Sequence, residues 1–348
     1  MTMADDRSPP HDRSRDPAQG AARRITHLPS PLRCYVRALL ASRKPAHARP
    51  LPPLAFEWRN VALEAEAIAR YARLCGFAQT SAVPPTWPHL LAFALHMLLM
   101  TDRAFPFAML GMVHLANRIV QHATLHAGDR LDFDVRCGAL YAHDKGQAFT
   151  VLTTARRGGE VVWSGESLYL RTGVGAALGT PYRAALGART SLIQTQAWSL
   201  PRDLGRQYAR VSGDYNPIHL WPITARCFGF PRPIIHGMWS FARALAAVLP
   251  GSPATLDLLV EFKTPILLPG QVTLWRQSDG APASGTAGDG SEPGTVFELR
   301  DAAGTVPHLR GRWQLAENAA TASPQRRGAG DTGAALGATG TVDAPAAS

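Results

Sequence analysis

The pattern of apolar and polar residues divides the chain into helical and strand-like segments that occur twice in the same order. In the first half, a strand is predicted from Leu54, and residues 61–74 have the apolar spacing of a helix that ends at Gly76. Residues 89–100 are almost uninterruptedly apolar, which predicts a helix buried on most of its sides. Four further strand-like segments follow, at residues 109–121, 130–141, 148–156 and 160–171.

The second half repeats this order. A strand is predicted at residues 192–198, a helix from Pro201 to about Val211, and an apolar helix at residues 235–249. The remaining strands are predicted at residues 256–263, 272–277, 295–300 and 309–316. A sheet wrapped around one helix is an economical way to bury a helix this apolar. The sequence therefore predicts an α+β fold of two units, each an antiparallel sheet around a central apolar helix.

A short duplication marks corresponding points of the two halves. The segment from Tyr71, YARLCG, is nearly identical to the segment from Tyr208, YARVSG. The predicted organisation follows: a basic, largely disordered arm (1–50), a first unit (51–172), a linker (173–190), a second unit (191–316) and a disordered tail (317–348). Within the arm, residues 32–41 have the spacing of a short helix that docks on the body, and residues 278–294 form a low-complexity loop.

The charge of the chain is concentrated in the arm. The formal net charge is +10, and residues 1–50 carry ten Arg and Lys residues against four Asp. A basic arm on a nearly neutral body is more typical of a solvated segment than of a nucleic-acid-binding domain. We therefore expect no nucleic-acid partner, although binding through the arm is an alternative.

The cysteine pattern and the apolar runs limit the compartment. The four cysteines are far apart and form no CxxC pair, which predicts reduced thiols rather than disulfides or a zinc site. The longest apolar run, at residues 90–100, is about half of what a membrane-spanning helix needs. The N-terminus lacks the apolar core of a signal peptide. A cytoplasmic protein without a membrane partner is expected.

Polar residues that can carry chemistry are concentrated in the second half. Asp214 and His219 are separated by Asn216-Pro217, a pair that favours a turn and can direct two nearby side chains to one point. A carboxylate and an imidazole so placed can act as a general acid/base pair. Gly237 begins the second apolar helix, where a backbone N–H and the helix dipole can stabilise a developing oxyanion.

The first half lacks these groups. Phe77 occupies the place of Asp214 in the duplicated motif, and Leu91-Ala92 occupies that of His236-Gly237. We infer that one half reacts and that the other shapes a cavity for an apolar chain.

These residues resemble a known signature. YARVSGDYNPIH followed by FGFPRPIIHGM is similar to the signature of the MaoC-like, or R-specific hydratase, family, and PPTWPHLLAF in the first half resembles the degenerate N-terminal hot dog of double-hot-dog dehydratases. The resemblance covers residues 54–316 and implies a double hot-dog fold. It also implies an (R)-specific 3-hydroxyacyl-thioester dehydratase or trans-2-enoyl-CoA hydratase. The substrate would be an acyl-CoA or an acyl carrier protein, and no further cofactor is expected.

The resemblance assigns roles to individual residues. It implies that Asp214 and His219 both contact the reacting water, and the sequence leaves open which of them handles the C2 proton. Gly237 is the candidate for the oxyanion hole. Asn216 is expected to position the loop and to touch the thioester or Asp214.

Other polar residues have weaker assignments. Arg210 and Arg232 are candidates for binding the phosphates of coenzyme A or phosphopantetheine, with plain surface charge as the alternative. His236 is expected to be structural and to bond a backbone group. No metal is expected, because no third ligand stands out beside His219 and His236. The first-half residues His89, His96 and His114 are interpreted as packing or surface residues.

One departure from the family concerns the support of Asp214. Some members carry a serine near the catalytic aspartate, about eight residues after the His-Gly glycine. Leu245 occupies that position here, while Ser240 lies one turn into the helix. The sequence leaves open what supports the carboxylate.

Two other functions remain as alternatives. A non-catalytic acyl-thioester-binding subunit would be expected to lack the Asp/His pair, which is present. A hot-dog thioesterase needs a carboxylate on a central helix, and neither predicted apolar helix contains one. The chain is expected to be a monomeric pseudo-dimer or a homodimer.

Overall fold

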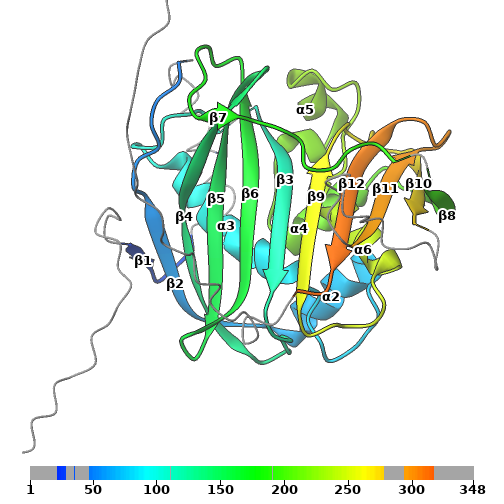
Figure 1. The fold of residues 1–348 in the computed structure, drawn as a ribbon, viewed down its shortest axis with the longest axis horizontal. Helices are drawn as coiled ribbons and strands as arrows, with labels where there is room; N and C mark the ends of the chain where they lie inside the picture. The colour runs from blue at the N-terminus through cyan, green and yellow to red at the C-terminus, as the bar shows by residue number, and fades with distance from the viewer. Residues whose placement is uncertain are drawn as a thin grey trace, which may run out of the picture. The chain divides into compact units, whose positions relative to one another are not determined.

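The computed structural model describes residues 22–28, 35, 47–109, 111–189, 191–277 and 294–316. Two apolar helices, α3 (Trp87–Thr101) and α6 (Gly237–Val248), lie behind one face of a large curved sheet (Figure 1). Twelve of the fifteen residues of α3 are buried, as its uninterrupted apolar sequence predicts. The prediction of an α+β fold with one central apolar helix in each half is confirmed.

The sheet is continuous through both halves. Across the described residues it contains 12 strands in the order β1-β2-β4-β5-β6-β3-β9-β12-β11-β10-β8, with β7 paired to β4. Their bounds are β1 (Arg23–Ile25), β2 (Ala55–Ala62), β3 (Met112–Gln121), β4 (Arg130–His143), β5 (Gly146–Arg157), β6 (Glu160–Thr172), β7 (Thr180–Pro181), β8 (Ile193–Leu200), β9 (Leu256–Phe262), β10 (Gly270–Arg276), β11 (Thr295–Asp301) and β12 (Pro307–Gln314). The halves meet where residues 116–121 of β3 pair with residues 256–261 of β9 in antiparallel register. The two predicted sheets are thus joined edge to edge.

The duplicated motif forms the same local structure twice. Helices α2 (Ala65–Cys75) and α4 (Leu204–Ser212) each end at a glycine in the left-handed conformation, Gly76 and Gly213, with φ of 81° and 75°. Glycine is favoured there because a side chain is strained at positive φ. The two helices pack on each other, and the rings of Tyr71 and Tyr208 lie 6.4 Å apart between centroids.

Some local predictions were wrong. The first-half helix was expected from residue 61, but β2 continues to Ala62, and the buried side chain of Val61 faces the core. Two short helices were not predicted, the 3₁₀ helix η2 (Pro217–His219) and α5 (Pro222–Cys227). Both begin with proline, and both are too short for an apolar period to reveal them.

The described part of the predicted arm is attached to the body. Strand β1 pairs with β2 in parallel register, and Arg23 forms a 2.6 Å ion pair with Asp102. Tyr35 is buried, at 7% exposure. The rest of residues 1–50, most of the loop at 278–294 and the tail from 317 lie outside the described residues. The described residues up to Ala316 belong to one unit, so the contacts do not separate the two predicted halves. The predicted domain boundaries therefore stay predictions.

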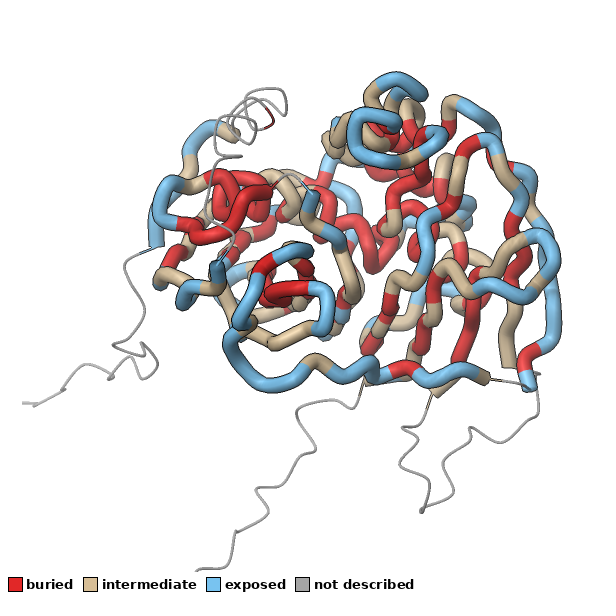
Figure 2. The backbone as a smooth tube through the Cα atoms, turned by 90° about the horizontal axis from the view of Figure 1, so that it is seen from above, coloured by how far each residue is buried: buried red, intermediate tan, exposed pale blue. Residues whose placement is uncertain are grey.

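Burial follows the sheet and the helices that it encloses. Figure 2 shows buried positions gathered along the strands and the enclosed helices, with exposed positions in the connecting loops. Cys75, Cys137 and Cys227 are free thiols, as predicted. None of the helices in the described ranges is both long enough and apolar enough to cross a membrane.

Candidate active site

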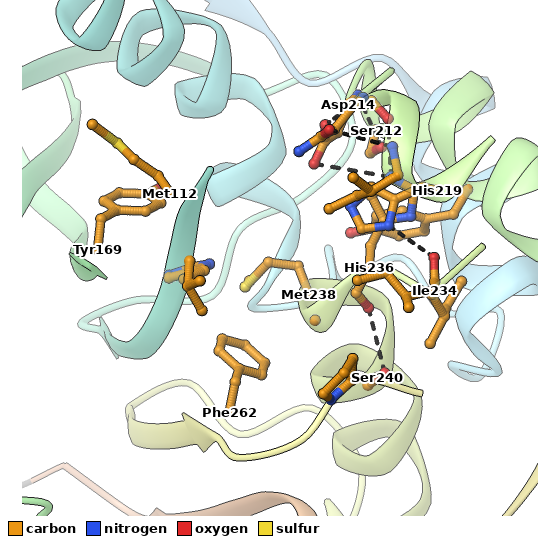
Figure 3. Close-up of a pocket in the computed structure, with 18 of the residues that line it drawn as sticks. Met112, Tyr169, Ser212, Asp214, His219, Ile234, His236, Met238, Ser240 and Phe262 are labelled. Carbon is orange, nitrogen blue, oxygen red and sulfur yellow. Dashed lines mark hydrogen bonds and ion pairs between the residues drawn. The ribbon is translucent and has the colours of Figure 1, made fainter. Parts of the chain in front are cut away.

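A cavity of about 520 Å³ is lined by residues of both halves. Helix α3 and strand β3 of the first half contribute a mostly apolar lining that includes three methionines, while the second half contributes most of the polar groups. Figure 3 shows Asp214, His219 and His236 together on one side of the cavity, away from Met112 and Tyr169. The principal lining residues are Tyr35, His89, Phe93, Met97, Met100, Met112, His114, Tyr169, Asp214, Asn216, His219, His236, Gly237, Met238 and Phe262.

Asp214 follows directly on the glycine that ends α4. Its Oδ1 accepts hydrogen bonds from the backbone N–H of Asn216 at 3.1 Å and from the hydroxyl of Tyr35 at 2.5 Å. Burial alone raises the pKa of Asp214, but His236 and His219 and these hydrogen bonds outweigh burial and hold the pKa below its usual value. The carboxyl group is therefore ionised at neutral pH, and its side chain keeps 23% exposure.

His219 lies at the end of η2. The side-chain oxygen of Asn216 accepts from the N–H of Ile218 at 3.4 Å, and Pro217 fixes the backbone of the first turn. The Nδ1 of His219 donates to the carbonyl oxygen of Ile234 at 2.8 Å, because a carbonyl can only accept. In the neutral ring Nε2 is therefore unprotonated and can act as a base.

The imidazole of His219 is neutral over the physiological range. Burial, followed by the neighbouring ring of His236, lowers the pKa of His219 to about 3, against the opposing charge of Asp214. The site thus contains two proton acceptors at neutral pH, one charged and one neutral. They come from two turns that the Asn216-Pro217 sequence connects.

His236 bonds a backbone group, as predicted, and its structural role stays a prediction. Its Nε2 donates to the backbone carbonyl of Asp214 at 2.9 Å, and its ring stacks on that of His219 with centroids 3.7 Å apart. Ser240 lies on the same helix, but its hydroxyl donates to the carbonyl of His236 at 3.3 Å. Ser240 therefore holds the start of α6.

The same three side chains could be read as a metal site. Asp214, His219 and His236 offer ligand atoms within 4.8 Å of one another, so a third ligand exists that the sequence did not reveal. The two rings are stacked, however, with 27° between their planes. An ion between them would lie over the ring faces, away from the nitrogen lone pairs that bind metals. This arrangement disfavours a metal, and its absence stays a prediction.

Gly237 is the first residue of α6. Its N–H belongs to the first turn of the helix, where backbone donors have no partner within the helix. A Cβ at this position would lie 3.0 Å from atoms of the Phe262 ring, which is tighter than ordinary packing. Glycine thus lets the strand and the helix start approach closely beside the cavity. Its oxyanion role stays a prediction.

The predicted substrate-binding residues differ in their placement. Asn216 lines the cavity and makes hydrogen bonds with Asp214 and Ile218 within the turn, and its expected role in positioning the loop stays a prediction. Arg210 and Arg232 are exposed and are not part of the lining, and Arg232 donates to the carbonyl of Pro269 at 3.2 Å. Their phosphate-binding role stays a prediction.

The first-half histidines are closer to the site than the sequence indicated. His89 and His114 line the cavity, which corrects their interpretation as packing or surface residues. Burial lowers the pKa of His89 to about 4 and that of His114 to about 3, while the charge of Asp214 raises both. His96 is fully buried and hydrogen bonds to the hydroxyls of Tyr169 and Thr153 at 3.0 and 2.8 Å. The carboxylate near them is distant in sequence, so local patterns could not reveal it.

Tyr35 is the site residue that the sequence analysis missed. Its hydroxyl contacts Asp214 across a separation of 179 residues. The only available signal was the apolar spacing of residues 32–41, which predicted that this segment docks on the body.

A continuous, mostly antiparallel sheet around two apolar helices defines a hot-dog protein, and in this one a carboxylate and a neutral imidazole lie beside a helix start. The chain belongs to the MaoC-like dehydratase family. The model of the MaoC like domain matches residues 175–268. The chain is also 32% identical over 247 residues to 3-hydroxyacyl-thioester dehydratase X of Mycobacterium tuberculosis, an alignment that covers 70% of this chain and 82% of that protein.

Solved structures and a further relative agree with this placement. The crystal structure of HtdX of Mycobacterium tuberculosis is 29% identical, with a TM-score of 0.62, and the match covers 75% of this chain and all of that one. A Mycobacterium tuberculosis protein described as having a double hot-dog fold is 14% identical, with a TM-score of 0.52 over 79% of this chain and 99% of that one, and shows the fold alone. The (R)-specific enoyl-CoA hydratase of Aeromonas caviae is 39% identical over 70 residues, which are 19% of this chain and 52% of that protein. The predicted double hot-dog fold and family are confirmed.

Proposed function

We propose that the protein is an (R)-specific hydro-lyase of acyl thioesters, which interconverts 3-hydroxyacyl and trans-2-enoyl thioesters. The observation that carries the proposal is the convergence of Asp214 and His219 beside the start of α6 in one cavity. Relatives named as dehydratases and hydratases support the same reaction class.

The protonation states of the pair suit water activation. At neutral pH the carboxylate of Asp214 and the Nε2 of His219 can each accept one hydrogen of a water molecule. During hydration the water oxygen bonds to C3 as one of the two groups takes its proton. Negative charge then develops on the thioester oxygen, where the N–H of Gly237 can stabilise it.

The proton taken from water is passed to the substrate by the same pair of residues. The group that took the proton from water delivers it to C2, so both residues return to their starting states. Dehydration follows the same path in reverse: the base removes a C2 proton, and the hydroxyl leaves C3 as water after protonation. The reaction is redox-neutral and needs only water, which is why we propose no cofactor beyond the coenzyme A or phosphopantetheine of the substrate.

The first half supplies the place for the acyl chain. The part of the lining that α3 and β3 contribute is mostly apolar, with Phe93, Met97, Met100 and Met112 among its members. Burial of an acyl chain against such surface contributes about 0.8 kcal/mol per methylene group. Exposed Arg210 and Arg232 remain candidates for the phosphates of the carrier, and a cytoplasmic location and a monomeric or homodimeric state remain predictions.

The test is a hydration assay with purified protein on crotonyl-CoA and on longer enoyl-CoA substrates. Asp214→Asn and His219→Ala should each abolish turnover, while Asp144→Asn and His126→Ala, which change exposed residues outside the cavity, should not. Turnover that survives both site changes would overturn the proposal. Thioester hydrolysis without hydration would instead favour a thioesterase, which the absence of a carboxylate from α3 and α6 argues against.

A further inference from the structure

We propose that Tyr35 is a positioning residue for Asp214, so that a residue from outside the two duplicated halves completes the active site. The inference rests on the proposed function, in which Asp214 is one member of the acid/base pair. No sequence motif and no relative described above assigns a role to this tyrosine.

The geometry assigns different tasks to the two oxygens of Asp214. Oδ1 accepts both the Tyr35 hydroxyl, at 2.5 Å, and the backbone N–H of Asn216, at 3.1 Å. Oδ2 has no hydrogen-bond donor within the described part of the chain and lies 3.9 Å from the Nε2 of His236. Two donors thus fix the carboxylate through one oxygen and leave Oδ2 for the reacting water.

Tyr35 is well placed for this task. It is 7% exposed and lines the cavity, so the hydrogen bond to Asp214 is partly shielded from water. A hydrogen bond to an ionised group is stronger than one between neutral groups, especially away from water. The phenol ring is also stiff, and a fixed donor limits the rotation of the carboxylate.

Tyr35 gives Asp214 a hydrogen-bond donor that the residues of α6 do not supply. Leu245 is fully buried in the core, and Ser240 bonds the carbonyl of His236. Neither residue supplies a donor to the carboxylate. Tyr35 supplies that donor from a different part of the chain.

The experiment compares Tyr35→Phe with Tyr71→Phe in the full chain. Tyr71 is also buried, shares a hydrogen bond with Thr86 at 2.7 Å and does not line the cavity. The hydrogen bond from Tyr35 stabilises the charged form of Asp214, so its removal raises the pKa of that carboxyl. Tyr35→Phe should lower kcat about tenfold with little change in KM, and should move the acid limb of the kcat/KM profile upward by roughly one pH unit.

Tyr71→Phe should lower the melting temperature by a few degrees and leave kcat and the pH profile unchanged. A purely structural role of Tyr35 would give the pattern of Tyr71, with lower stability and an unmoved acid limb. That result would overturn the proposal.

A second readout separates this inference from the proposed function. The Asp214 carboxyl can be titrated by NMR with ¹³C-labelled aspartate and assigned by its loss in Asp214→Asn. If Tyr35→Phe raises this pKa but the wild type hydrates no enoyl-CoA, the contact stands and the proposed function fails. If the wild type is active but neither the titration nor the acid limb moves, the role of Tyr35 is refuted.

Discussion

The two halves use the same helix and turn for different ends. Both α2 and α4 end at a glycine in the left-handed conformation, and the two halves differ in the residue that follows it. In the first half Phe77 stacks on the ring of Tyr71, with centroids 6.2 Å apart. In the second half Asp214 takes that place and reaches the cavity. The duplicated framework supplies the position, and one polar residue with the inserted Asn216-Pro217 turn supplies the chemistry.

The buried imidazoles show the same contrast. The first half contains His89, His96 and His114, and the ring of His89 contacts those of the other two. The second half contains His219 and His236, stacked beside a carboxylate. Burial lowers the pKa in both groups, so the imidazoles alone do not distinguish the halves. The carboxylate of Asp214 does, because ligand nitrogens of His219 and His236 lie within 4.8 Å of it, and in the proposed function it forms an acid/base pair with His219.

The largest effect is expected from a comparison of two single variants, each of which replaces one histidine, in the second half or in the first. His219→Ala removes a proton acceptor and should reduce turnover to background, a loss of at least about 10²-fold in kcat, with the fold retained. His96→Ala leaves the hydroxyls of Tyr169 and Thr153 without their partner and should destabilise the protein by about 2 kcal/mol with little change in kcat. Steady-state kinetics and urea unfolding measure the two effects. Equal losses of activity would contradict the division of roles.

The next effect tests the start of α6. Gly237→Ala places a methyl group 3.0 Å from the ring of Phe262, which must shift to admit it. The displaced N–H should lower kcat about ten- to a hundredfold with a smaller change in KM. Ala247→Gly, toward the other end of the same helix, is the control and should affect stability only. An unchanged kcat in Gly237→Ala would contradict the expected displacement of the helix start and would show that the Phe262 ring alone takes up the added methyl group.

The pH dependence of stability tests whether both sets of histidines are buried and neutral. The folded-state pKa values of His89, His114 and His219 are lowered to about 4, 3 and 3. A lowered pKa contributes stability that is complete above the unfolded value of about 6.5 and is lost as pH falls toward the folded value. Each such group should therefore lower the free energy of unfolding by about 1.4 kcal/mol at pH 5.5 relative to neutral pH. Urea unfolding at pH 7.5, 6.5 and 5.5 measures this, and a pH-independent result would contradict the buried neutral state.

The smallest effect is expected on stability, when the two tyrosines of the duplicated motif are each replaced by phenylalanine. Tyr71 shares a hydrogen bond with Thr86, whereas the buried hydroxyl of Tyr208 has no partner among the described residues. Tyr71→Phe should therefore destabilise the protein by about 1 kcal/mol. Tyr208→Phe should leave stability unchanged or raise it slightly, because it removes an unsatisfied group. Thermal unfolding measures both variants, and equal losses of stability would contradict the difference between the two positions.

Most of the fold could be predicted from the sequence because its elements are long and strongly patterned. The apolar helix at residues 89–100 and the strands that follow it match the structure within a few residues. The first-half helix was predicted too early because Val61 and its neighbours fit either period, and pairing of β2 with β4 decides between them. That pairing joins segments about seventy residues apart and leaves no local signature.

The residues of the site also differ in whether local sequence could reveal them. Asp214, His219 and Asn216 lie within six residues of one another, so their turn could be anticipated from local sequence. Tyr35 and the cavity-facing His89 reach the site only through tertiary packing. Their contribution depends on contacts across the fold, which no motif in a single sequence records.

The central claim is that an acid/base pair in the second half adds water to an enoyl thioester held against the first half. The most direct measurement is the configuration of the 3-hydroxybutyryl-CoA formed from crotonyl-CoA, by chiral analysis, for the wild type and for Asp214→Asn. We expect (R)-3-hydroxybutyryl-CoA from the wild type and none above background from the variant. Formation of the (S) product, or equal amounts of (R) product from both proteins, would contradict the account.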